Sequence, residues 1–120
     1  NDDPSNRSCK TVLGAKKKQQ EVQAGGYFNT MWEMFDKGIG TLAYNGSWNL
    51  FDQIIISGNL LGKDRSTLKY IRSEVFNRDF LKKKKGKYKV YPLRTHAAGV
   101  YLNGYSDHFP TLIYLAKEIK

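Results

Sequence analysis

The chain has 120 residues, of which 40% are hydrophobic and 26% charged, so the composition predicts one globular domain over residues 1–120 and leaves too little sequence for a second. With 13% aromatic residues, no apolar run near about 18 residues and a single cysteine, it excludes a disordered chain, a transmembrane helix, an internal disulfide and a zinc site built on several thiolates. The net charge of +9 favours polyanionic partners such as nucleic acid, phosphoesters or anionic membranes, although a basic surface also serves solubility alone.

The N-terminal segment predicts a short helix over residues 3–14. An aspartate followed by a proline suits the first positions of a helix, and Gly14 suits its end. Cys9, Val12 and Leu13 follow the i, i+3, i+4 spacing of one helix face, so we expect all three to be buried. The polar and glycine-rich residues that follow predict a surface connection.

A second helix is predicted from Thr30 to Gly38. Thr30 and Glu33 have the spacing of a capping box, in which each side chain accepts a hydrogen bond from the backbone N–H of the other residue. Gly38 suits the end of the helix. Its expected apolar face consists of Met31, Trp32 and Phe35.

Beyond this helix the hydrophobic pattern changes to the period of two that is typical of strands. Residues 41–44 and 48–57 flank Asn45-Gly46, the strongest short signal of a two-residue turn, so we expect a hairpin. The second of these strands would carry Asp52.

The C-terminal half predicts two more strands, at residues 70–76 and 111–116, and an exposed loop at residues 82–89, which contain six lysines. The order of elements, two helices followed by several strands, predicts an α+β fold with a mainly antiparallel sheet and covering helices.

Asp52 is unusual for a strand. It shares a face with Leu50, Ile54 and Ile56, and an aspartate is a poor strand former that is costly to bury without a partner. Asp52 therefore requires a charged or hydrogen-bonding partner, unless it faces water at the wetter end of the strand.

A carboxylate and an imidazole, Asp107 and His108, are adjacent in a segment stiffened by Pro110 and followed by an apolar strand. A neutral imidazole can accept or donate a proton near pH 7, and a carboxylate bonded to its other nitrogen fixes the tautomer. Asp52 is the candidate for that carboxylate. The other histidine, His96, has no acid nearby in the sequence and is interpreted as a surface or packing residue.

The lysine run at residues 82–89 has two interpretations. It could bind nucleic acid, but a channel for single strands usually combines charge with several aromatic side chains, and only Tyr88 and Tyr91 are near in the sequence. A solvated loop is therefore the favoured interpretation.

Three segments together resemble the endonuclease/exonuclease/phosphatase superfamily. Residues 1–4 (Asn-Asp-Asp-Pro) resemble the end of its Gly-Asp-Phe-Asn motif, residues 50–57 resemble its Arg-Ile-Asp-Tyr-Ile-Phe-Val-Ser strand, and residues 104–110 resemble its closing Ser-Asp-His-x-Pro motif. Two positions depart from the pattern, because Leu50 stands at the arginine and Gln53 at the tyrosine.

This resemblance implies that the chain is the C-terminal part of a four-layered α/β sandwich and supplies about one of its two sheets. The metal-binding glutamate and the first-motif aspartate of the family would lie upstream of Asn1, in a missing N-terminal part of the same protein. We therefore expect the isolated chain to be inactive, and to associate with itself through the sheet face and strand edge left uncovered.

The resemblance also implies the roles of individual residues. His108 would be catalytic, contacting the scissile phosphate or acting on the attacking water, and Asp52 would orient it. Asn1 would hold a phosphate oxygen, and Asp107 would be a ligand of the divalent metal, Mg²⁺ or Mn²⁺, directly or through water.

The expected function is thus phosphodiester or phosphomonoester hydrolysis by a metal-dependent parent protein, with DNA, phospholipid and inositol phosphate all open as substrates. The alternative is a non-enzymatic basic domain that binds nucleic acid or anionic lipid through the lysine run.

Overall fold

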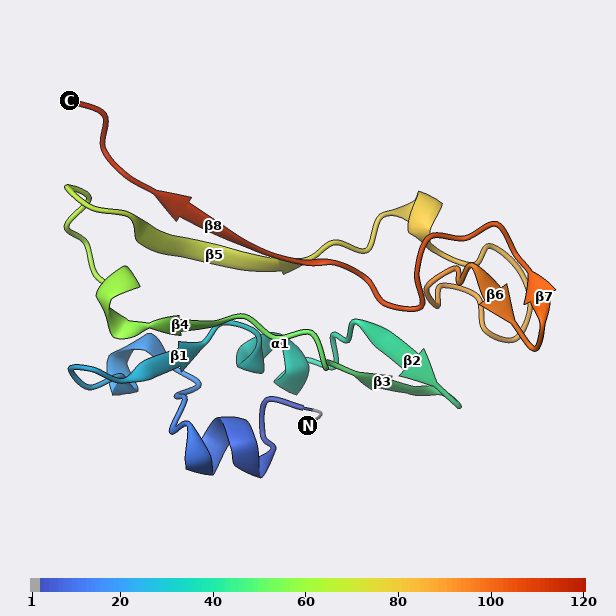
Figure 1. Cartoon of the computed structure of the whole chain (residues 1–120), viewed down its shortest axis with the longest axis horizontal. Coiled ribbons are helices and arrows are strands. Elements are labelled where there is room, and N and C mark those ends of the chain that lie inside the picture. The colour runs from blue at the N-terminus through green and yellow to red at the C-terminus, as the bar shows by residue number, and fades with distance from the viewer. Residues whose placement is uncertain (1–2) are drawn as a thin grey trace.

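The computed structural model describes residues 3–120 and shows an α+β arrangement of short helices and small antiparallel sheets (Figure 1). The strands are β1 (Tyr27–Asn29), β2 (Leu42–Tyr44), β3 (Ser47–Asn49), β4 (Ile55–Ser57), β5 (Lys69–Val75), β6 (His96–Ala97), β7 (Val100–Tyr101) and β8 (Thr111–Ala116). The helical elements are the π-helical turn η1 (Ser8–Val12), the α-helix α1 (Trp32–Asp36) and the 3₁₀ turns η2 (Gln19–Glu21), η3 (Gly58–Leu60) and η4 (Asp79–Leu81).

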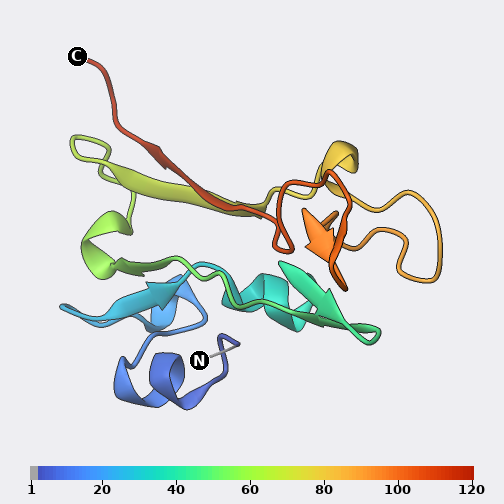
Figure 2. The same ribbon diagram turned by 45° about the vertical axis from the view of Figure 1, so that its right-hand side comes forward.

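The strands form four antiparallel pairs instead of the single sheet expected from the sequence. β1 pairs with β4, β2 with β3, β5 with β8 and β6 with β7. The long β5–β8 pair runs along one side of the molecule, and β1–β4 and β2–β3 lie on the other side in both ribbon views (Figures 1 and 2). The described helices have five residues or fewer, so the expected covering helices and sandwich layers are not confirmed.

The first helix is shorter than predicted, and its buried face is wrong. Only Cys9 of the three expected residues is buried, whereas Val12 is 75% exposed and Leu13 is 40% exposed. The reason is the wide π-helical turn, in which Leu13 N–H donates to the Ser8 carbonyl, so residues three and four apart no longer share one face. Gly14 follows with a φ of +70°, which confirms the predicted end.

The second helix, α1, also begins differently from the prediction. The Thr30 hydroxyl donates to the Ile54 carbonyl at 2.7 Å instead of capping the helix, and the Asn29 side-chain oxygen accepts from Met31 N–H at 3.1 Å. A contact with a segment distant in sequence therefore replaces the capping box. Gly38 ends the helix as predicted, with a φ of +77°.

The predicted hairpin is confirmed, but its second strand is split. Asn45 and Gly46 have φ values of 47° and 87°, as a two-residue hairpin turn requires. The strand predicted over residues 48–57 breaks because β3 pairs with β2 while β4 pairs with β1. Asp52 therefore lies in the extended crossover at residues 50–54, and not on a paired strand.

The two C-terminal strands are confirmed. β8 has the predicted bounds and β5 differs from the prediction by one residue at each end. Where this pair ends, Phe76 N–H donates to the Pro110 carbonyl at 2.7 Å, so the residue after β5 is bonded to the end of the segment at residues 104–110. The lysine run is a loop, as predicted, and is mostly exposed.

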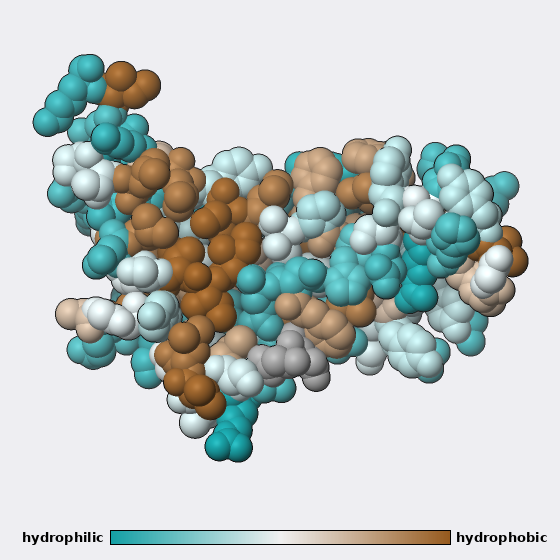
Figure 3. Space-filling view, in the orientation of Figure 1, coloured by the Kyte–Doolittle hydropathy of each residue, from teal (hydrophilic) through white to brown (hydrophobic). Residues whose placement is uncertain are grey.

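The core is small and lies between β1–β4, the β2–β3 hairpin and the start of β8. Its buried apolar residues are Cys9, Ala15, Phe28, Met31, Ala43, Leu50, Ile56, Val75 and Phe109. Many other apolar side chains remain exposed, and Figure 3 shows a group of them in a band that runs from β5 and β8 towards η1. No helix within residues 3–120 has the length and apolar character needed to cross a bilayer.

Candidate functional site

Asp52 and His108, 56 residues apart in sequence, form a hydrogen bond. His108 Nδ1 lies 2.7 Å from Asp52 Oδ2, and the two side chains are 33% and 36% exposed, respectively. This confirms the predicted pairing. Because an ionised carboxylate only accepts, Nδ1 carries the proton, and Nε2 of the neutral imidazole keeps the lone pair that can accept one.

The β2–β3 hairpin fixes the backbone next to His108. The buried Phe109 stacks on Trp48, with ring centroids 6.0 Å apart, and Phe109 N–H donates to the Thr41 carbonyl at 2.7 Å. On the other side, His108 N–H donates to the Ser106 hydroxyl at 3.1 Å. Aromatic packing and these hydrogen bonds thus hold the backbone on both sides of His108.

Gly104 explains how this segment reaches the site. A Cβ at this position would lie 2.0 Å from the Leu93 carbonyl oxygen, so only glycine fits there. Tyr105 N–H donates to the same carbonyl at 3.0 Å, and the Thr95 hydroxyl donates to the Gly104 carbonyl at 3.1 Å. Residues 104–108 are therefore attached to residues 93–95.

Asp52 is held by its neighbours in the crossover. The fully buried Leu50 donates its N–H to Asp3 Oδ1 at 3.2 Å, and Gln53 Oε1 accepts from the Asn29 amide at 2.8 Å. The thiol of Cys9 approaches the same Gln53 oxygen at 3.4 Å.

Sequence reasoning missed Asn29 and interpreted Gln53 only as a departure from the family pattern. Asn29 is fully buried. One indication of this was present in the sequence, because Asn29 is a polar residue between the aromatic pair Tyr27-Phe28 and the predicted apolar helix. Asn1, the third predicted catalytic residue, lies outside the described residues, although nearby Asp3 contacts the segment that carries Asp52.

Asp107 is exposed and stands one residue before the histidine of the pair. A carboxylate oxygen is a ligand that Mg²⁺ accepts, but Mg²⁺ needs an octahedral set. In residues 3–120 no group of three or more His, Cys, Asp or Glu side chains is placed to hold a metal ion. Asp107 thus fits one ligand position, and these residues alone do not fit a complete metal centre.

The other histidine does not take part in this arrangement. His96 is exposed on β6 and packs against the Tyr101 ring at 5.1 Å between centroids. Its predicted assignment as a surface residue is confirmed.

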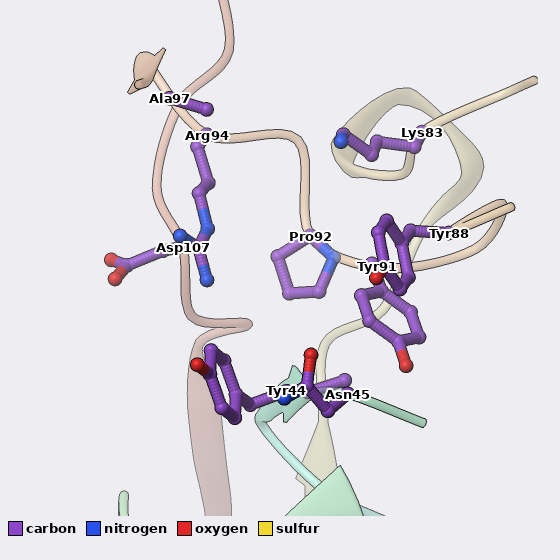
Figure 4. A pocket seen from close by; sticks show the side chains of 10 residues that line it. Tyr44, Asn45, Lys83, Tyr88, Tyr91, Pro92, Arg94, Ala97 and Asp107 are labelled. Carbon is purple, nitrogen blue, oxygen red and sulfur yellow. The ribbon is translucent and has the colours of Figure 1, made fainter. Parts of the chain in front are cut away.

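A cleft of about 220 Å³ adjoins the site through Asp107 (Figure 4). Its walls come from β2 and the turn after it, the lysine loop, residues 91–97, and Asp107 in the segment before β8. The lining residues are Ala43, Tyr44, Asn45, Lys83, Tyr88, Tyr91, Pro92, Arg94, Ala97 and Asp107. The fold thus adds Tyr44 to the two tyrosines that the sequence placed near the lysine run.

Comparison with known proteins agrees with this geometry. No curated protein and no solved structure was found to match the chain. A family model described as the endonuclease/exonuclease/phosphatase family matches residues 1–117, which is nearly the whole sequence and includes both members of the Asp52–His108 pair. The chain therefore belongs to the endonuclease/exonuclease/phosphatase family.

Proposed function

We propose that this domain is the C-terminal portion of a phosphoesterase that hydrolyses phosphodiesters or phosphomonoesters with Mg²⁺ or Mn²⁺. The 2.7 Å hydrogen bond between Asp52 and His108 is the observation that carries the proposal. Membership in the family supports it, because the family generally depends on a divalent metal.

In this proposal His108 Nε2 accepts the proton of the attacking water while the new O–P bond forms and the leaving oxygen departs with the electrons of the broken P–O bond. Asp52 keeps the imidazole in the required tautomer and stabilises the imidazolium that results. In a variant of this mechanism, His108 is instead protonated on both ring nitrogens, so that Nδ1–H donates to Asp52 and Nε2–H donates to the scissile phosphate.

The proposal predicts that the metal also requires ligands from outside the 120 residues. Asp107 would supply one oxygen ligand, and Asn1 would hold a phosphate oxygen. The bound ion would neutralise charge on the phosphate. Since residues 3–120 offer no complete metal-binding group, the remaining ligands would come from an N-terminal part of the same protein.

The test uses a longer protein that contains this domain. His108→Ala and Asp52→Ala should each lower kcat about 10²- to 10⁴-fold, whereas His96→Ala, which changes an exposed histidine outside the pair, should leave it unchanged. Full activity of His108→Ala would overturn the proposal. The 120-residue chain alone should show no turnover with Mg²⁺ or Mn²⁺, and turnover that His108→Ala abolishes would show that these residues suffice.

The exposed lysine loop favours a second candidate, a non-enzymatic basic domain that binds nucleic acid or anionic lipid. Binding that survives Asp52→Ala and His108→Ala but disappears when the lysines are replaced, in a longer protein without phosphoesterase activity, would select this candidate.

A further inference from the structure

We infer that the cleft next to Asp107 binds a nucleobase, so that the substrate of the site is a nucleic acid with an unpaired base. This inference rests on the proposed function, because it names the substrate class of the same site. It is argued from the size of the cleft, its aromatic walls, its position, and two cations that have no carboxylate partner within residues 3–120.

The walls are aromatic and held in place. The Tyr91 hydroxyl accepts from Gly46 N–H at 2.7 Å, and its ring packs edge-on against Trp48, with centroids 5.4 Å apart. Tyr88 lies beside Tyr91 at 5.2 Å, and the Tyr91 carbonyl accepts from Lys83 N–H at 2.8 Å. The lysine loop is thereby attached to the hairpin turn, and the cleft between them is formed before a ligand arrives.

Tyr44 supplies an accessible stacking surface on the opposite wall. It follows the buried Ala43 on β2, yet it is 68% exposed. In Figure 4 its ring lies at the lower left of the group of side chains, and Tyr88 and Tyr91 lie to the right. Bases stack on such rings whatever their identity, because every base has a π-face.

Two cations in the cleft lack a carboxylate partner. Within residues 3–120 no ion pair involves Lys83 or Arg94, and Figure 4 shows the Arg94 side chain extending between Asp107 and Pro92. An Arg or Lys side chain in this position suits a backbone phosphate. A base in the cleft and a phosphate near these cations would belong to one nucleic-acid strand.

Size and position select among the phosphoesters. About 220 Å³ is below the range of about 300–1,000 Å³ that drug-sized ligands occupy, so the cleft suits one planar ring and not a lipid tail. The three tyrosines favour a base over a phosphorylated inositol, because the inositol ring is saturated and has no π-face to stack on them. Because Asp107 lines the cleft and His108 is the next residue, the cleft lies beside the Asp52–His108 pair, and we infer that a nucleotide held here has its phosphate on the side of that pair.

Binding can be tested on the 120-residue chain without metal, by fluorescence anisotropy with two probes. One is a labelled single-stranded oligothymidylate, and the other is an abasic oligonucleotide of the same length, which keeps the phosphates and lacks the bases. Tyr44→Ala should weaken binding of the first probe about tenfold and leave the second unchanged. Tyr44→Phe should bind both probes with the affinity of the unsubstituted 120-residue chain.

Control variants separate stacking from charge. Tyr101→Ala removes a tyrosine of similar exposure that does not line the cleft, and should have no effect. Arg94→Gln should weaken both probes equally and lower the salt dependence. An equal loss with both probes for Tyr44→Ala, or no loss with either, would overturn the inference. The proposed function fails separately, through full turnover of His108→Ala in the longer protein.

Discussion

The ring of Phe109 stacks on the indole of Trp48, with an interplanar angle of 19°, and this contact sets the position of the adjacent His108. Trp48 also packs edge-on against Tyr91 of the cleft. One residue of the β2–β3 hairpin thus supports both the Asp52–His108 pair and the cleft beside it, which is why the two lie together.

This role predicts a large loss of stability for Phe109→Ala. The side chain is 2% exposed, and truncating a buried phenylalanine costs about 3–5 kcal/mol, a large part of the stability of a typical small domain. Urea unfolding measures the loss. Phe80→Ala, at an exposed position, is the control and should cost much less. Equal losses for the two variants would show that the stack contributes little.

The hydrogen bond between Asn29 and Gln53 predicts that the position of Asp52 depends on the buried Asn29 side chain. Asn29→Leu removes the acceptor of the buried Met31 N–H and the donor to Gln53, so we expect a loss of about 1–3 kcal/mol in the free energy of unfolding. We also expect the Asp52 segment to shift.

NMR can detect that shift separately from the loss of stability. The Nδ1 proton of His108 should give a downfield signal in the parent chain because of its bond to Asp52. The signal should weaken in Asn29→Leu and vanish in Asp52→Ala. Asn59→Leu, at an exposed position outside this network, is the control. An unchanged signal in Asn29→Leu would mean that Gln53 does not position Asp52.

The elements that the sequence predicted well depend on local chemistry. Asn45-Gly46 adopts the turn because both residues tolerate a positive φ, and β8 follows from an apolar run that begins after Pro110. Thr30 behaves differently, because its hydroxyl donates to the carbonyl of Ile54, 24 residues away in sequence, and does not cap the helix. A local pattern contains no information about such a partner.

The site shows the same division. The Asp52–His108 pairing was predictable because a carboxylate among isoleucines needs a partner and because the motifs resemble a known family. The cleft was not, because Tyr44 and Tyr91 line one cleft only when the lysine loop is held against the hairpin turn by the bond from Gly46 N–H to the Tyr91 hydroxyl.

Glu74 predicts how stability changes with pH. Hydrogen bonds from the Tyr114 hydroxyl and from Arg72 lower the pKa of its carboxyl group below the usual value of 4.5, and the nearby charge of Arg78 acts in the same direction. A folded-state pKa below the unfolded value gives stability that is present above about pH 4.5 and is lost as the pH falls through the folded pKa. Acid should therefore weaken the β5–β8 pair.

The measurement is the midpoint of thermal unfolding as a function of pH. Glu74→Gln should lower the midpoint at pH 7 and flatten its fall below pH 4.5, because the variant has no carboxylate to protonate. Glu118→Gln, at an exposed position near the C-terminus, should keep the slope of the parent. A Glu74→Gln profile parallel to that of the parent would contradict the assignment.

The exposed apolar band predicts that the 120-residue chain associates with a second copy. Ile71, Leu112 and Leu115 are exposed on β5 and β8, and each of these strands has one described neighbour, so its other edge is open to pairing. Monomeric proteins rarely expose an apolar band beside an open strand edge, because both favour association. We expect light scattering at micromolar concentration to report a dimer.

A charged substitution tests whether this band is the contact. Leu115→Lys places a charge on β8 and should shift the dimer towards monomer, since burying an unpaired lysine in an apolar interface is costly and a lysine on an edge strand opposes pairing. Val100→Lys, on β7 away from the band, should leave the dimer unchanged. A parent chain that stays monomeric and unfolds cooperatively would show that these residues close their own core, and the exposed band would then have no role in self-association.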